Sequence, residues 1–168
     1  MVKIEDLKKI NLLHGLPDDL LTIISPEAHL SIYNTDTVLF DTDEDIDTFY
    51  MLIMGQVAHK IALSPDVNII LDTIQSGSSF GIASLVPGIN ASSTAVCQEP
   101  CEVITLSSKK MTQLFEMHHE LGYQVMLRLA LHYKEKLDSR TNMIMKTLDS
   151  NPELKNKIDD IENLTPIF

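Results

Sequence analysis

The chain has 168 residues, of which 44% are hydrophobic and 22% are charged, a composition typical of a folded globular protein. A chain of this length forms about one domain and buries a sizeable core without disulfides, for which its two cysteines supply no framework. No apolar run approaches the roughly 18 residues of a membrane-spanning helix, and the N-terminus lacks the apolar core of a signal peptide. We therefore expect a cytoplasmic protein with no membrane partner.

The formal net charge of -11 is unevenly distributed. Residues 10–108 contain thirteen acidic residues and a single basic residue, Lys60. Because nucleic-acid binding needs a basic surface, this distribution argues against a nucleic-acid partner. An anion bound in this region has at most one lysine to pair with, so it would depend on backbone N–H groups and hydroxyls.

Two short helices are expected first, around Ile4–Ile10 and over Asp18–Ile24, where Asp18 and Asp19 occupy the first turn. From about residue 29 to 106 the pattern changes to short apolar or alternating runs separated by turn residues, which predicts seven or eight strands of an all-β sandwich, barrel or jelly roll. The predicted strands are His29–Tyr33, Thr37–Phe40, Thr48–Met54, Gln56–Leu63, Val67–Ile74, Ser92–Cys97 and Cys101–Leu106. Gly55, between two of these strands, indicates a bend or bulge.

Helices return after Leu106. Ser107 and Ser108 are positioned to cap a helix, and Gly122 either interrupts it or joins it to a second, longer helix reaching Leu148. Residues on this longer helix follow heptad spacing, which predicts a dimer interface. The predicted interface residues are Met126, Ala130, Tyr133, Leu137, Arg140 and Ile144. We expect Arg140 to pair with Glu135 or Asp138 of the second chain.

This order of elements, over about residues 7–148, resembles the cyclic-nucleotide-binding domain of the catabolite activator protein (Crp/Fnr-like) superfamily. Leu12–Leu21 is similar to the family's opening helix, and Asp47–Val57 to its central hairpin. Gly77–Leu85, followed by Ala95–Val96 and Glu99–Val103, resembles its phosphate cassette and the strand beyond. The resemblance implies an eight-stranded jelly-roll β-roll, a double-stranded β-helix, with short N-terminal helices and a long C-terminal helix. We expect this domain over 1–148, with a dimerisation helix at about 119–148, and a tail at 149–168 that holds at most one short helix.

The family's cassette presents backbone N–H groups to a cyclic phosphate, a glutamate to the ribose 2′-hydroxyl and an arginine to the phosphate oxygens. Ile82 occupies the glutamate position of this chain, and Ala91 occupies the arginine position. Both charged contacts of the family are therefore replaced by apolar side chains. The candidate ligand-binding residues that the resemblance implies are Phe80, Gly81, Ile82, Ala83, Ser84, Ala91, Ser92 and Ser93. The alternative is that Phe80, Ile82, Ala83, Leu85 and Val86 simply pack the interior of the roll.

Other candidate sites are weaker. The acidic loop Phe40–Asp47 has the Asp-x-Asp-x-Asp opening of a calcium loop, but Ile46 and Leu52 stand where its turn glycine and bidentate glutamate belong, so we expect a solvated turn. Cys97 and Cys101 lack partners at zinc-site spacing, so a structural role is expected. Some relatives of this fold bind haem, for which His59 is the candidate. No set of catalytic residues is visible.

The sequence thus predicts a regulatory module that is not an enzyme, needs no cofactor or metal, and acts by forming a homodimer and contacting another regulatory protein. The family's DNA-binding domain is not expected, because about twenty residues follow Leu148 and they include no basic recognition helix. Standard cyclic-nucleotide binding is expected to be weak or lost. Two alternatives remain: a working cAMP or cGMP sensor that uses backbone and serine contacts, and a haem or metal sensor.

Overall fold

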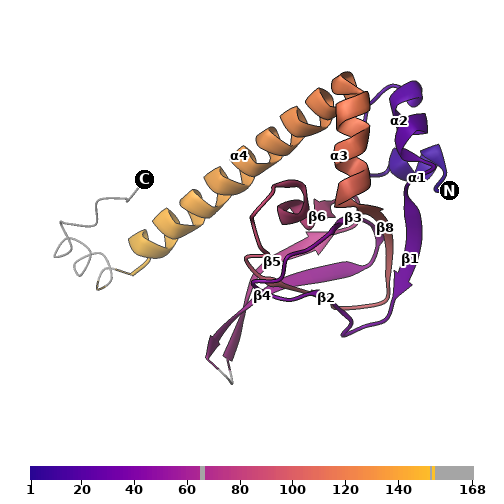
Figure 1. The fold of residues 1–168 in the computed structure, drawn as a ribbon. Coiled ribbons are helices and arrows are strands. Elements are labelled where there is room, and N and C mark those ends of the chain that lie inside the picture. Colours follow the sequence, from indigo (N-terminus) through magenta and orange to yellow (C-terminus); the bar gives the residue numbers. More distant parts are fainter. Residues whose placement is uncertain (65–66, 152, 154–168) are drawn as a thin grey trace. The chain divides into compact units, whose positions relative to one another are not determined.

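In the computed structural model, residues 1–64, 67–151 and 153 are described (Figure 1). Met1–Met126 form one compact unit, and a second unit begins at Leu127. The helices are α1 (Ile4–Leu7), α2 (Asp18–Ile24), the 3-10 helix η1 (Ile82–Leu85), α3 (Ser108–Met117) and α4 (His119–Asp149). The strands are β1 (His29–Tyr33), β2 (Val38–Phe40), β3 (Thr48–Met54), β4 (Gln56–Ser64), β5 (Val67–Gln75), β6 (Ser79–Phe80), β7 (Thr94–Cys97) and β8 (Cys101–Ser107).

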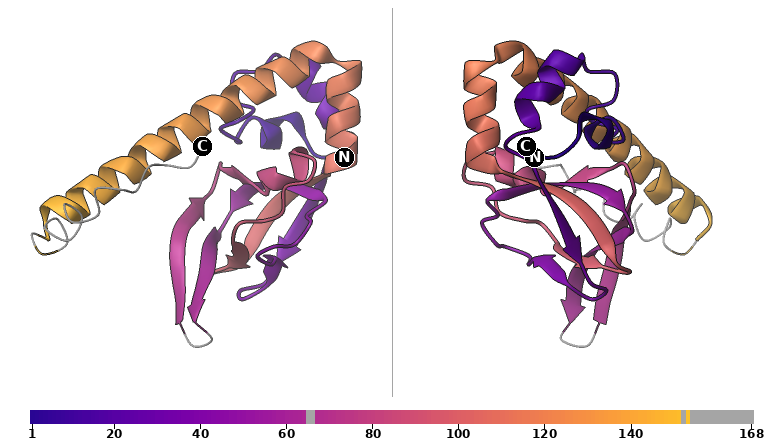
Figure 2. Two further views of the ribbon diagram at one scale, coloured as in Figure 1. Left: turned by 60° about the vertical axis from the view of Figure 1, so that its left-hand side comes forward. Right: turned by 90° about the vertical axis from the view of Figure 1, so that its right-hand side faces the viewer.

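The eight strands form two antiparallel four-stranded sheets, in the orders β1-β8-β3-β6 and β2-β7-β4-β5 (Figure 2). The predicted β-roll with short N-terminal helices and a long C-terminal helix is therefore confirmed. None of the described helices combines the length and apolarity needed to cross a membrane. The predicted short helix in the tail beyond residue 151 lies outside the described residues, apart from residue 153.

Alternation along the strands divides the core of the first unit into two layers. Leu52 and Val103 face each other in the register of β3 and β8 and belong to the cluster that fills the roll. Their neighbours Met51 and Ile104, also paired in register and fully buried, point to the opposite face of the sheet. The helices α1, α2 and α3 lie beside this sheet, at one end of the roll (Figures 1 and 2). Fully buried side chains of these helices complete the second layer: Leu7, Leu21, Ile24 and Met111.

Two local predictions about the C-terminal helices need correction. Ser107 occupies the N-cap position of α3, but its side chain makes no capping hydrogen bond. Instead, the Ser108 N–H donates to Asp47 O at 2.7 Å. The break between α3 and α4 falls at His118, whereas Gly122 lies inside α4, where a Cβ would come within 3.0 Å of Phe115 Cβ. Gly122 therefore permits close approach of the two helices rather than interrupting one.

Gly55 marks the place where the chain passes from one sheet to the other, between β3 and β4. Its φ of +100° favours glycine, and a Cβ there would lie 2.7 Å from both Cys101 Sγ and Pro100 O. Gly15 also has a positive φ, of +73°, but nothing lies within 4 Å of a Cβ built on it.

The pair of substitutions Gly55→Ala and Gly15→Ala separates backbone strain from steric overlap. Each is expected to cost about 1–2 kcal/mol for the left-handed conformation. Gly55→Ala should lose a further 1–3 kcal/mol, roughly, because buried neighbours must move. Thermal unfolding should therefore show a larger drop in Tm for Gly55→Ala, at about 2–4 °C per kcal/mol. Equal drops for the two variants would contradict a close contact at Gly55.

Candidate functional site

The cassette begins where β6 ends and runs through η1 to the start of β7. Gly81 follows β6 with a φ of +73°, and the Ser84 N–H donates back to Gly81 O at 3.1 Å. A Cβ at Gly81 would lie 2.7 Å from Tyr50 Cδ2 and 3.0 Å from Thr48 O. The cassette therefore starts with its backbone pressed against β3, a position that only glycine fits without a shift.

The two positions at which the resemblance implies charged contacts are apolar and differ in burial. Ile82 is half-buried at the start of η1, whereas Ala91 is only 3% exposed. The backbone of Ala91 is paired on both sides, because its N–H donates to Glu44 O at 2.9 Å and its carbonyl accepts from the Asp43 N–H at 2.8 Å. Neither position supplies a group that pairs with a phosphate or a ribose hydroxyl.

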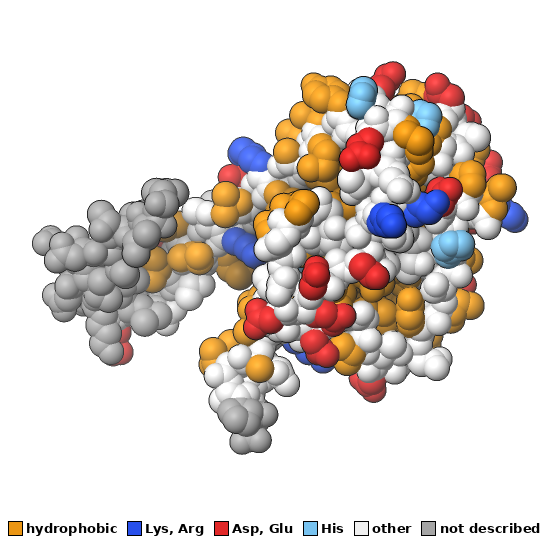
Figure 3. Space-filling model, viewed as in Figure 1, with side chains coloured by type: hydrophobic (Ala, Val, Ile, Leu, Met, Phe, Trp, Pro, Cys, Tyr) orange, Lys and Arg blue, Asp and Glu red, His pale blue; other side chains and the backbone are white. Residues whose placement is uncertain are grey.

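The acidic loop 41–47 is fastened to the cassette by these backbone bonds. Asn90 Nδ2 also donates to Asp43 O at 2.7 Å, and the Thr42 N–H donates to Thr94 Oγ1 at 3.1 Å. The carboxylate side chains of the loop are mostly exposed, which confirms the predicted solvated turn, while Ile46 anchors the loop in the core. Acidic side chains also gather on the face of the roll shown in Figure 3. The cassette thus lies beside negative charge, which disfavours an anionic ligand.

The serines of the cassette lie in three different environments. Ser92 is exposed, Ser93 is buried, and Ser84 is half-buried on η1. The Ser84 hydroxyl is buried and has no hydrogen-bond partner among the described residues. Ser84 and Ser92 are therefore the hydroxyls that a ligand could still engage.

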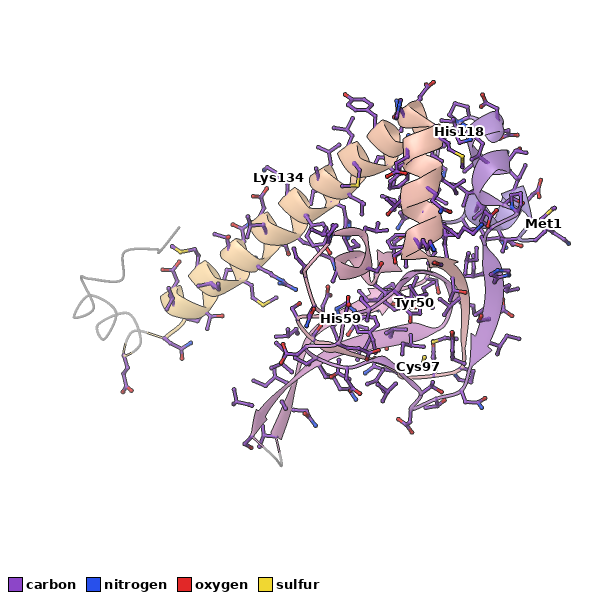
Figure 4. All side chains as sticks on the ribbon, in the orientation of Figure 1. Met1, Tyr50, His59, Cys97, His118 and Lys134 are labelled. Carbon is purple, nitrogen blue, oxygen red and sulfur yellow. The ribbon has the colours of Figure 1, made fainter. Side chains whose placement is uncertain are left out.

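Four rings fill the interior of the roll next to the cassette. The rings of Tyr50 and Phe80 stack with centroids 5.0 Å apart, and Phe40 lies 5.7 Å from Tyr50. His59 meets Phe40 and Phe80 edge-on, each at 6.1 Å. Burial raises the pKa of Tyr50 to about 12, so its hydroxyl stays protonated at neutral pH. Figure 4 shows Tyr50 and His59 within the roll.

Lys60 lies outside this interior. His59 points inward, so its neighbour Lys60 points to the outer face of β4, opposite Thr94 in the register. There it lines a surface hollow of about 430 Å³ together with Asp41, Thr42 and Asn68. This lysine is therefore placed to face the acidic loop rather than a ligand inside the roll.

Cys97 and Cys101 are fully buried side chains of the core cluster, and both are free thiols that form no disulfide. Burial raises the pKa of Cys97 to about 12, and the neighbouring Cys101 thiol makes a smaller contribution in the same direction. Among the described residues, no three His, Cys, Asp or Glu side chains come together as a metal-binding group.

The predicted interface residues on α4 lie along one side of the helix. At about 100° per residue, all of them fall within roughly 60° of the direction of Leu137. The exposed fractions are 46% for Met126, 49% for Tyr133, 66% for Leu137 and 60% for Ile144. Leu121 and Val125, which are fully buried, point about 120–160° away from Leu137. The heptad residues are thus not the ones that α4 buries in its own chain.

The ion pair expected of Arg140 stays a prediction. Asp138 already pairs with Lys134 one turn earlier on the same helix. Glu135, also exposed, therefore becomes the stronger candidate for pairing with Arg140 across a dimer.

Comparison with known proteins identifies the family to which the chain belongs. The family model for the cyclic nucleotide-binding domain matches residues 31–118, which cover β2 to β8, the cassette and all of α3. The chain belongs to this family. It is 29% identical over 104 residues to the cAMP-activated global transcriptional regulator CRP of Pasteurella multocida, an alignment that covers 61% of this chain and 50% of that protein. With the protein of the same name from Haemophilus influenzae it shares 27% over 127 residues, 75% of this chain and 57% of the relative.

The chain thus spans about half the length of the curated relatives it matches. Solved structures show the same fold. A putative cyclic nucleotide-binding protein from Geobacter metallireducens matches with a TM-score of 0.71 at 21% identity, covering 82% of this chain and 99% of that one. A cyclic nucleotide-binding domain from Methylobacillus flagellatus matches with a TM-score of 0.74 at 18% identity, covering 86% and 81%. The resemblance inferred from the sequence is therefore confirmed.

Two parts of the site were missing from the sequence prediction. The first is the attachment of the acidic loop to residues 90–91, for which buried Ile46 among five acidic residues was the available signal. The second is the ring cluster, whose members come from β2, β3, β4 and β6.

The alternative interpretation of the cassette was that its apolar residues pack the interior of the roll. This holds for Phe80, which is 2% exposed, but not for Val86, which is 38% exposed.

Proposed function

We propose that this chain is a regulatory module of the cyclic-nucleotide-binding family that acts through dimerisation on α4 and contacts with another protein, with standard cyclic-nucleotide binding weak or lost. It is not an enzyme in this proposal. The observation that carries the loss of binding is the pair Ile82 and buried Ala91 at the two charge-bearing positions of the cassette.

The size of the loss follows from the missing contacts. A hydrogen bond to a charged group contributes about 1.5–3 kcal/mol. Losing two of them weakens a cyclic nucleotide by about 3–6 kcal/mol, or roughly two to four orders of magnitude in Kd. The carboxylates of the loop fastened to Ala91 repel the phosphate further, within the roughly 8 Å range left by physiological salt.

Exposed apolar side chains on α4 support the part of the proposal that concerns the dimer. Leu137 and Ile144 are large apolar side chains, both at least 60% exposed, at positions spaced by one heptad. Such a stripe favours a second helix as partner, because burying it removes apolar surface from water on both sides.

A second candidate is a cyclic-nucleotide sensor that uses backbone and hydroxyl contacts alone. The buried Ser84 hydroxyl, which has no hydrogen-bond partner among the described residues, and the exposed Ser92 favour it. Thermal unfolding in the presence of a cyclic nucleotide separates the two candidates.

Thermal unfolding with 1 mM cAMP or cGMP is expected to leave the Tm of the protein unchanged to within about 1 °C. A ligand with a Kd of 1 μM would stabilise the folded state by about 4 kcal/mol at this concentration. For a chain of this size that corresponds to a rise of about 8–16 °C. A rise of that size would favour the hydroxyl-based sensor and contradict the proposed loss of binding.

A further inference from the structure

The surface hollow beside Lys60 lies on the outer face of the sheet formed by β2, β7, β4 and β5. Its volume of about 430 Å³ is within the range of about 300–1,000 Å³ that is usual for small-ligand sites. Because His59 points into the roll and Lys60 points out of it, the sheet separates this hollow from the ring cluster. We call it the outer hollow, and its lining residues are Asp41, Thr42, Lys60, Ala62, Asn68, Thr94 and Val96.

The outer hollow holds the one basic residue between positions 10 and 108, Lys60, which is half-buried. Lys60 forms no ion pair with a described residue, although thirteen acidic residues belong to the same part of the chain. In the register of β4 and β7 it faces Thr94, which is uncharged. Since an ammonium group partly removed from water is stabilised by an anion, Lys60 is available to an anionic group that enters the hollow.

Asp41 brings a negative charge to the same hollow. Thr94 Oγ1 accepts from the Thr42 N–H at 3.1 Å and donates to Asp41 Oδ1 at 3.4 Å, so it orients the carboxylate. The two threonine hydroxyls also lie 3.1 Å apart. The Asp41 N–H donates to Glu44 Oε2 at 2.8 Å, which fixes the start of the loop. Asp41 is therefore held in place while its carboxylate remains exposed to a ligand.

The two opposite charges determine which class of ligand suits the outer hollow. An anion that pairs with Lys60 would also meet the Asp41 carboxylate and the acidic surface around it, whereas a cation that pairs with Asp41 would meet Lys60. A zwitterion pairs with both side chains and adds no net charge to a protein that already carries -11. A free α-amino acid has the required carboxylate and ammonium group on one carbon atom.

We propose that the outer hollow binds a free aliphatic α-amino acid, with its carboxylate on Lys60 and its ammonium group on Asp41. Val96, which is only 9% exposed, and Ala62 supply an apolar surface for the ligand's side chain. The Asn68 amide offers a further donor and acceptor. This site uses neither the cassette nor the α4 dimer, so it stands or fails independently of the proposed function.

The first test titrates the ¹⁵N-labelled full chain with L-valine up to about 50 mM and follows the backbone amide signals of Thr42 and Thr94. L-valine is expected to shift both signals with a Kd of about 1–10 mM. The matched controls are isovalerate, which is valine without the ammonium group, and isobutylamine, which is valine without the carboxylate. Each control loses one charge pair and should bind at least about fivefold more weakly. Equal Kd values for the three compounds, or no saturable shift with L-valine, would overturn the proposal.

The second test measures the Kd of L-valine for three variants whose fold is checked by circular dichroism. Lys60→Gln and Asp41→Asn should each raise the Kd at least about fivefold. Lys109→Gln is the matched control, since Lys109 is an exposed lysine on α3 that does not line the hollow, and it should leave the Kd within twofold. In Asp41→Asn, L-valine should bind no more tightly than isovalerate, because the ammonium group has lost its partner. If Asp41→Asn still prefers L-valine, or if all three variants bind it like the wild type, the proposed site is wrong.

Discussion

Replacing Leu137 and Ile144 together with glutamate is expected to turn the dimer into a folded monomer. In the proposed α4 dimer, these two residues of each chain would together place four large side chains in the seam, and burying each would contribute about 1.5–3 kcal/mol. That sum is comparable to the about 4–15 kcal/mol that association costs in lost freedom. The four glutamates would in addition place like charges opposite one another in a desolvated seam. Both side chains are at least 60% exposed in the isolated chain, so the variant should keep its fold.

The matched control for this variant is Met143→Glu. Met143 lies on the same helix and is 65% exposed, against 66% for Leu137, but it points about 120° away from the seam. Light scattering should give a monomer mass for the double variant and a dimer mass for the control. A dimer mass for Leu137→Glu with Ile144→Glu would place the interface elsewhere, and a monomer mass for Met143→Glu would show that any added charge on α4 disrupts the dimer.

Restoring the two missing charges, with Ile82→Glu and Ala91→Arg, is expected to increase cAMP affinity by at least tenfold. The full gain of two to four orders of magnitude is not expected, because Ala91 is buried and bonded to the loop that carries Asp43 and Glu44. Those exposed carboxylates compete with a phosphate for the new guanidinium. Isothermal titration at millimolar nucleotide measures the change.

The control for restoration is Ile82→Gln with Ala91→Gln, which introduces side chains of similar length without charge. Circular dichroism establishes that both variants remain folded. Equal affinities for the two would mean that charge is not what the cassette lacks. The packed rings of Phe40, Tyr50 and Phe80 would then account for the loss of binding.

The sequence predicted the strands well where their residue pattern extends over several residues. The bounds of β1 and β3 agree with the prediction: β1 alternates polar and apolar residues, whereas β3 is a short continuous apolar run that Gly55 follows. β6 was missed since its two residues, Ser79 and Phe80, are too few to show a period. The long helix was predicted to within one residue at each end, as its heptad spacing continues over several turns.

The candidate site was less accessible to sequence reasoning. The resemblance to the family assigns its two charge-bearing positions to Ile82 and Ala91, and the residue types there imply the missing charges. The contacts around them were not readable, since the loop at Asp43 and Glu44 meets Ala91 across more than forty residues of sequence. Pairings of that kind depend on the register of the sheets, which local pattern does not determine.

The most direct measurement of the central claim is the mass of the wild-type chain in solution at micromolar concentration, with and without 1 mM cAMP. The account predicts twice the monomer mass of 18.8 kDa in both conditions, because the α4 dimer does not depend on a nucleotide. A mass near 18.8 kDa in both conditions, or a dimer that forms only when cAMP is added, would contradict it.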